Sequence, residues 1–390
     1  MTELDLVFLC DTTGSMGSYL NAAQQSIEKI INTIIQSEKC DVRFALVEYK
    51  DHPPQDSSFA FRLTDFTDSM KCIKEAVNKM DANGGGDTPE SVCCAMHCAS
   101  NLKYREKAAK VIVWIGDAPP HGFIREGDGF PKGCPCGCDL LKEVRECMNK
   151  DIVIYCVGAE PLTSEYLRTL MRAVAQLTGG QYAALASANV LGELITNGAI
   201  EEIQTKGVIN HIKEVLEKDP SFKALPPNEK QKRAKEEIEK QTKSTEIEGI
   251  EIETIFKHEL APIPQIFLIA ESLKDLKDKM YEMPDIQVEF KDGLFTTQNR
   301  FMRGMMVGCA AVPMVRAGVC FEAVHPCCFE AVHPCCFEEA RGVETDELVE
   351  EKARGELEER IATQEIRKKK GRVTKEQSER MKQRINNWYK

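Results

Sequence analysis

The chain has 390 residues, of which 42% are hydrophobic and 29% are charged, and its formal net charge is -11. This composition is typical of a soluble globular protein with an apolar core, and it excludes a fibrous or disordered chain. The acidic balance also argues against a globally basic protein that binds nucleic acid.

The sequence shows no pattern of a membrane span or of a secretory signal peptide. No stretch approaches the roughly 20 apolar residues of a membrane-spanning helix. The N-terminus lacks the positive region and the apolar run of a signal peptide. We therefore expect a cytoplasmic protein, with a nuclear location as the alternative. In such a compartment the 17 cysteines are expected to be free thiols or metal ligands rather than disulfides.

Short apolar runs alternate with helical patterns in the first half of the chain. We expect strands at 4–10, 42–49, 111–115 and 152–157, an edge strand at 59–63, and a short last strand after 180. We expect helices at 19–36, 67–80, 88–102, 140–150 and 165–177. This alternation predicts an α/β fold with a doubly wound, mostly parallel sheet flanked by helices. Ligands of such sheets bind at the carboxyl ends of the strands.

The second half of the chain is more charged and mainly helical. One or two amphipathic helices are expected at 188–218, a solvated helix or linker at 219–247, and a strand at 250–256. We divide the chain into a sheet domain at 1–200, a charged linker at 201–249, an unassigned region at 250–343 and a charged tail at 344–390. The tail is acidic at first and basic over 366–390. The basic run 367–372 predicts either a solvated terminal helix or a patch for polyanions, such as a nuclear-localisation signal. Nucleic-acid binding is not expected elsewhere.

Three polar loops carry the chemistry. Asp11, Thr13 and Ser15 fit the pattern D-x-[ST]-x-S after the first strand, Thr88 lies in a later loop, and Asp117 follows a central strand. Mg²⁺ prefers hard oxygen ligands and keeps some waters. The hydroxyls would bind the ion, and the carboxylates would hold its waters and orient the hydroxyls. The alternative is that these residues only cap helices and form turns.

These five residues resemble the von Willebrand factor A domain with its metal-ion-dependent adhesion site, and the resemblance covers roughly residues 3–200. It implies a Rossmann-like fold and a bound Mg²⁺, or else Mn²⁺ or Ca²⁺. It also implies a protein partner whose Asp or Glu fills the open position of the ion. The implied function is metal-dependent protein–protein interaction.

A narrower resemblance rests on the stretch after Asp117. The runs Ala118-Pro-Pro-His-Gly122 and Asp128-Gly-Phe-Pro-Lys-Gly-Cys-Pro-Cys-Gly-Cys138 are similar to the A domains of α-protein-kinase proteins of the vwkA type. The alternative function is therefore an atypical Ser/Thr kinase, or a remnant of one, acting in signalling. Residues 200–390 show no counterpart of the kinase domain, so we expect a binding protein rather than an enzyme.

Cysteine and histidine gather in two places. His121, Cys134, Cys136 and Cys138 could form a tetrahedral Zn²⁺ site, or the cysteines could be free thiols that line the crevice. The octapeptide Cys-Phe-Glu-Ala-Val-His-Pro-Cys occurs twice in tandem over 320–335. It is either a neutral duplication or a metal-binding or redox segment.

Overall fold

The computed structural model describes residues 2–36, 40–159, 162, 166–185, 188–243, 246–254, 261–282, 364–373 and 375–385. The tandem octapeptide and most of the acidic part of the tail lie outside the described residues. Met1–Ile255, Ile263–Met283 and Thr363–Lys390 form one compact unit, and Phe256–Pro262 and Pro284–Ala362 form another. The first unit contains the sheet, and it is the one described below.

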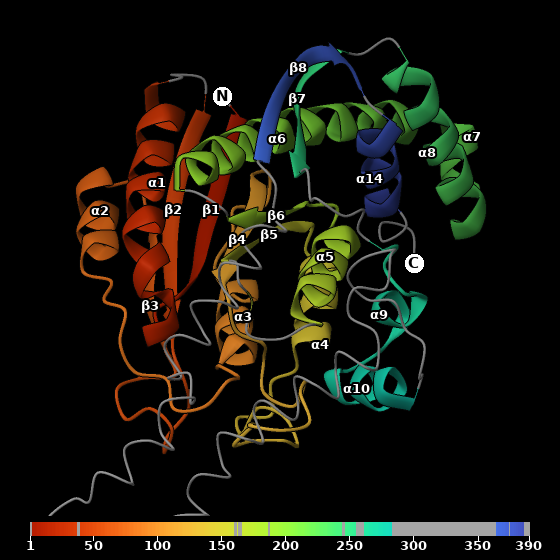
Figure 1. Cartoon of the computed structure of the whole chain (residues 1–390). Helices are drawn as coiled ribbons and strands as arrows, with labels where there is room; N and C mark the ends of the chain where they lie inside the picture. Colours follow the sequence, from red (N-terminus) through yellow and green to blue (C-terminus); the bar gives the residue numbers. More distant parts are fainter. Residues whose placement is uncertain are drawn as a thin grey trace, which may run out of the picture. The chain divides into compact units, whose positions relative to one another are not determined.

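A six-stranded sheet forms the centre of this unit (Figure 1). Its strands are β1 (Thr2–Asp11), β2 (Cys40–Tyr49), β3 (Phe61–Thr67), β4 (Ala109–Gly116), β5 (Ile152–Ala159) and β6 (Tyr182–Leu185). They lie in the order β3-β2-β1-β4-β5-β6, and only the pairing of β2 with the edge strand β3 is antiparallel. The strand that follows β1 in the chain, β2, pairs with one edge of β1, and β4 later pairs with its other edge. The strand order thus reverses between β1 and β4, and a ligand crevice is expected at their carboxyl ends.

Helices cover both faces of the sheet. Right-handed crossovers that run in opposite directions put α1 (Gly17–Gln36) on one face, and α4 (Leu140–Asn149) and α5 (Leu167–Thr178) on the other. α2 (Met70–Asn78) and α6 (Ala188–Lys218) join α1 in one core cluster with alternate residues of the strands. α3 (Val92–Ser100) packs near β1 and β2. Both faces of β1, β4 and β5 are buried, so the sequences of these strands are mostly apolar.

Capping residues set where several helices begin and end. The carboxylate of Asp139 accepts hydrogen bonds from the backbone N–H groups of Leu141 and Lys142, which starts α4. The Ser69 hydroxyl accepts one from the Cys72 N–H at the start of α2. Gly179 ends α5 with a φ of 83°, a left-handed conformation that favours glycine.

The far half of α6 supports a second apolar cluster. It packs with α7 (Pro220–Lys223), α8 (Pro227–Thr242) and α14 (Lys375–Ile385). The buried residues of this cluster are Ile209, Ile212, Leu216, Phe222, Ala234, Ile238, Met381 and Ile385. The buried guanidinium of Arg384 in α14 bonds Asp151 and Glu202. Residues near the end of the chain therefore complete a core that begins near its middle.

A separate two-stranded sheet pairs β7 (Glu246–Thr254) antiparallel with β8 (Gln364–Arg372). Its register pairs Glu246 with Arg372 at one end and Thr254 with Gln364 at the other. Two further α-helices among the described residues are α9 (Gln265–Ile269) and α10 (Leu273–Glu282). The Leu273 N–H donates to Asp139 Oδ2 over 2.9 Å, which holds α10 at the start of α4.

The predicted α/β fold class is confirmed, and most elements begin or end within a few residues of their expected bounds. Two differences are informative. The helix expected from residue 88 begins at Val92, because residues 83–91 form a loop at the carboxyl edge of the sheet. The expectation of a terminal helix over 367–372 is wrong, because these residues pair with β7 as a strand. Within the described residues, no helix combines the length and the apolar character needed to cross a bilayer.

Candidate metal centre at the carboxyl end of the sheet

The D-x-T-x-S motif folds into a continuous chain of hydrogen bonds at the end of β1. The hydroxyl of Thr13 donates to Asp11 Oδ1 over 2.6 Å, and its N–H donates to the same oxygen over 2.9 Å. Thr13 Oγ1 and Ser15 Oγ lie 3.2 Å apart. The Ser15 hydroxyl donates to Asp117 Oδ1 over 2.9 Å. The structure thus joins four of the five predicted site residues through the turn that leads into α1.

The loop at 83–90 is held against this motif by its backbone. The Asn83 N–H donates to Thr12 O over 3.2 Å, and the Gly14 N–H donates to Gly84 O over 3.1 Å. Gly85 has a φ of 81°, and a Cβ on it would lie 2.9 Å from Glu90 Oε1 and 3.4 Å from Thr13 Cβ. Glycine at this position therefore allows the two loops to approach closely.

Thr88 lies in the same loop and is half-buried. Its N–H donates to Gly127 O over 3.4 Å, and a Cβ on Gly127 would lie 3.7 Å from Thr88 Oγ1. The contacts that place this fifth predicted residue therefore run to the segment that follows Asp117.

Glu90 is a buried carboxyl that the motif search missed. Only 3% of it is exposed, and its N–H donates to Pro119 O over 2.9 Å. Its position two residues after Thr88, in the run Gly-Asp-Thr-Pro-Glu, is the sequence signal that could have identified it. The carboxyl ends of β1 and β4 thus bring Asp11, Asp117 and Glu90 into one region.

Burial and mutual repulsion dominate the electrostatics of this region. Burial, together with the charge of Asp117, raises the pKa of Asp11 to about 7, although hydrogen bonds from Thr13 act in the other direction. Burial raises the pKa of Asp117 to about 6 against the effect of its bond from Ser15. Burial, and then repulsion from Asp11 and other carboxylates, raises the pKa of Glu90 to about 11. Acidic groups in a low-dielectric site favour a cation there.

Two oxygens of this region are left without hydrogen bonds. Asp11 Oδ2 and Glu90 Oε2 are buried and have no partner among the described residues. Buried polar atoms are nearly always satisfied in proteins, so these two unpaired oxygens need an explanation, and a bound cation would provide one. Oxygens from carboxylates and hydroxyls form the donor set that Mg²⁺, Mn²⁺ and Ca²⁺ prefer. The residues present therefore fit a hard divalent cation.

His121, predicted as a zinc ligand, lies in a different set of contacts. Its Nε2 is 2.6 Å from Asp51 Oδ1, and its Nδ1 is 2.9 Å from Asp128 Oδ1. Burial alone would lower the pKa of His121, but the hydrogen bonds to Asp128 and Asp51 outweigh it and raise the pKa to about 9. Asp128 also accepts the N–H groups of Gly122 and Phe130. This ion pair therefore shapes the loop after Asp117.

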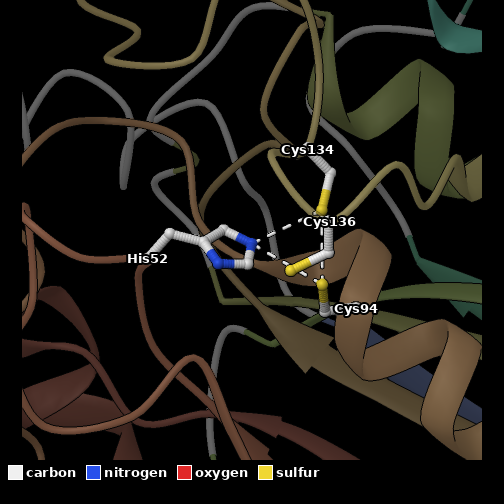
Figure 2. A group of neighbouring side chains, drawn as sticks. All are labelled: His52, Cys94, Cys134 and Cys136. Carbon is white, nitrogen blue, oxygen red and sulfur yellow. Dashed lines mark hydrogen bonds between the residues drawn. The ribbon is translucent and has the colours of Figure 1, made fainter.

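Cys134 and Cys136 meet two residues that the sequence reading did not select (Figure 2). One ligand atom from each of His52, Cys94, Cys134 and Cys136 lies within 4.8 Å of the other three. Cys138 lies nearby, with its Sγ 4.0 Å from Cys94 Sγ. His52 follows β2, and Cys94 lies in α3, so only the folded chain brings them beside the predicted cysteines.

Comparisons with known proteins agree with this fold. Residues 5–122 match the family model of the von Willebrand factor A domain. The α-protein kinase vwkA of Dictyostelium discoideum is 30% identical over 149 residues, which are 36% of this chain and 23% of that protein. A putative ariadne-like RING finger protein of Acanthamoeba polyphaga mimivirus is 25% identical over 230 residues, which are 57% of this chain and 21% of that protein. The chain thus spans less than a quarter of either relative.

Solved structures give a weaker likeness. A von Willebrand factor type A protein from Catenulispora acidiphila has a TM-score of 0.39 at 17% identity, over 52% of this chain and 43% of that chain.

Proposed function

We propose that this chain is a metal-dependent protein-interaction module, because residues 5–122 match the family model of the von Willebrand factor A domain. The metal-ion-dependent adhesion site would consist of Asp11, Thr13, Ser15, Thr88 and Asp117. The observation that carries the proposal is the chain of hydrogen bonds from Asp11 to Asp117, next to the unpaired Asp11 Oδ2.

The donor set suits Mg²⁺, with Mn²⁺ or Ca²⁺ as substitutes. The hydroxyls of Thr13, Ser15 and Thr88 are neutral oxygen ligands, and the carboxylates of Asp11 and Asp117 would orient them and hold water. When bound, the ion would supply a positive centre that attracts an anionic oxygen. A carboxylate of a partner's Asp or Glu matches that chemistry.

Mn²⁺ binding to the purified full chain tests the metal part of this proposal, with isothermal titration calorimetry as the assay. We expect one Mn²⁺ to bind the wild type, Mg²⁺ to compete with it, and Asp117→Ala to weaken binding at least tenfold. Asp41→Ala is the matched control, because this half-exposed carboxylate lies at the start of β2, at the opposite end of the sheet. Equal Mn²⁺ affinity of wild type and Asp117→Ala would contradict the proposal.

Acetate tests the open position of the ion. The bound Mn²⁺ relaxes water protons through the waters that it keeps, so a carboxylate that displaces one of them lowers the relaxation rate. We expect acetate to lower the rate of the Mn²⁺-loaded wild type in a saturable way. If acetate has no effect while Mn²⁺ remains bound, the site holds a metal but does not bind a partner carboxylate.

Protein kinase activity is a second candidate, and the name of the Dictyostelium relative, an α-protein kinase, is what suggests it. The activity belongs to that protein, of which this chain covers 23%. Incubation of the purified chain with radiolabelled Mg-ATP tests it. Incorporation of phosphate would support a kinase, and its absence would leave the binding module alone.

A further inference from the structure

Three separate segments bring soft metal ligands to one point beside the sheet (Figure 2). His52 lies in the loop after β2, Cys94 in the first turn of α3, and Cys134 and Cys136 in the loop that joins β4 to α4. Three of the four are buried, and only Cys136 is exposed. The four residues are called the His/Cys cluster below.

The distances within the His/Cys cluster are close to those around a tetrahedral ion. Zn–S bonds of about 2.3 Å and Zn–N bonds of about 2.0 Å set ligand separations of about 3.8 Å for two sulfurs and about 3.5 Å for sulfur and nitrogen. Cys94 Sγ and Cys134 Sγ lie 3.2 Å apart. His52 Nε2 lies 3.6 Å from Cys94 Sγ and 3.4 Å from Cys134 Sγ. Three of the six edges of a ligand tetrahedron therefore lie within about 0.6 Å of these values, and the ligand atom of Cys136 lies within 4.8 Å of the other three.

A disulfide is the main alternative to a metal. Two bonded sulfurs lie about 2.05 Å apart, whereas Cys94 and Cys134 are free cysteines with sulfurs 3.2 Å apart. A disulfide would also leave His52 Nε2 and Cys136 without a role. A metal engages all four side chains at once.

We propose that His52, Cys94, Cys134 and Cys136 bind one structural Zn²⁺ ion. Three thiolates and one neutral imidazole form a closed set of four ligands, which is typical of structural rather than catalytic zinc. Binding converts three thiols to thiolates, and their protons pass to the solvent. No electron transfer is involved, since zinc keeps its charge. This site is separate from the proposed Mg²⁺ site, and it uses none of its residues.

The loop between β4 and α4 shows what such an ion would do. The structure describes every residue of 117–139, which form turns and bends with one isolated bridge at Pro120. Ordered connections of this length are uncommon without a cross-link or a function. The pair of His121 and Asp128 fixes the first half of the loop, and Phe130 packs edge-on against the His52 ring at 5.8 Å. Zinc would fix the second half to α3 and to the loop after β2.

Metal analysis of the full chain tests this proposal. We expect about one zinc per chain in protein purified without chelator, measured by inductively coupled plasma mass spectrometry. Cys94→Ser and Cys136→Ser should each lower the retained zinc at least tenfold after dialysis against a weak chelator. Cys138→Ser and Cys72→Ser are the matched controls and should retain it, because Cys138 lies outside the His/Cys cluster and Cys72 is an exposed cysteine of α2.

X-ray absorption at the zinc edge is measured on the wild type, so its result does not depend on whether a variant folds. We expect three sulfur ligands at about 2.3 Å and one nitrogen at about 2.0 Å. Wild-type protein that holds less than a tenth of an equivalent of zinc after zinc loading would overturn the proposal. So would an absorption spectrum dominated by oxygen ligands. The proposal would also be wrong if mass spectrometry of the alkylated, unreduced protein found a disulfide between Cys94 and Cys134, because the two sulfurs could then not bind zinc as thiolates.

Discussion

The ion pair of His121 gives a stability that should depend on pH in a defined direction. The two hydrogen bonds to Asp128 and Asp51 raise the pKa of His121 from its ordinary value of 6.5 to about 9, against the opposing effect of burial. Each pKa unit corresponds to about 1.4 kcal/mol of preference for the charged form. After an allowance for screening by solvent, the folded protein gains about 2–3 kcal/mol from the charged ring.

The sign follows from the raised pKa. Below about pH 6.5 the ring is protonated in both the folded and the unfolded chain, so the whole contribution is present. As the pH rises through 9, the folded protein loses this proton and the contribution disappears. His121→Gln removes the titrating group but keeps a polar side chain. The free-energy cost of this substitution should therefore be largest near pH 6.5 and should shrink by about 2–3 kcal/mol toward pH 9.5.

Urea denaturation of wild type and His121→Gln between pH 6 and pH 9.5 measures this cost. His97→Gln is the control, because this side chain is 54% exposed, and its partner Glu143 keeps a hydrogen bond from the Ser100 hydroxyl. We expect its cost to stay below about 1 kcal/mol at every pH. If the cost of His121→Gln stays constant or grows as the pH rises, the proposed ion pair does not stabilise the loop.

Three further predictions concern buried contacts that stabilise the fold around the site. Asp5→Ala should lower the free energy of unfolding in urea by about 3 kcal/mol, because this fully buried carboxylate accepts hydrogen bonds from two arginine side chains. Asp41→Ala, which removes a half-exposed partner of one of them, should cost under about 1 kcal/mol. Gly116→Ala should lower the free energy of thermal unfolding by about 1–3 kcal/mol, because its Cβ would lie 2.5 Å from the buried hydroxyl of Tyr49. Unchanged thermal unfolding would contradict this prediction. Arg384→Met should speed hydrogen exchange over residues 375–385, because it removes the buried bonds of α14 to Asp151 and Glu202. Unchanged exchange there would show that apolar packing alone holds α14.

The sequence was sufficient to predict those strands and site residues that depend on neighbouring positions in the chain. The run Val111–Ile115 is apolar throughout, since both faces of β4 are covered, and it predicts a strand without further context. Asp11, Thr13 and Ser15 lie within five residues, so a single turn brings them together. The place of Asp117 followed from the rule that parallel strands end at a common edge of the sheet.

The remaining features depend on contacts between distant segments. The His/Cys cluster joins segments of the chain that are 40 to 82 positions apart, and no spacing rule connects His52 with Cys134. The basic run of β8 lacks the alternation of a strand, and its pairing with β7 decides its conformation. Glu90 was missed because a single acidic residue in a loop is usually exposed, and only the fold buries it.

The return of α14 to the far half of α6 affects the order in which the chain can fold during synthesis. All six strands of the main sheet have been translated once Leu185 is made. The apolar cluster of α6, α7 and α8 lacks Met381 and Ile385 until the ribosome has reached them. A nascent chain thus exposes an unfinished hydrophobic surface for the whole interval between these points. In a crowded cell such a surface favours aggregation or chaperone binding, so the synthesis of α14 is the step that completes this cluster.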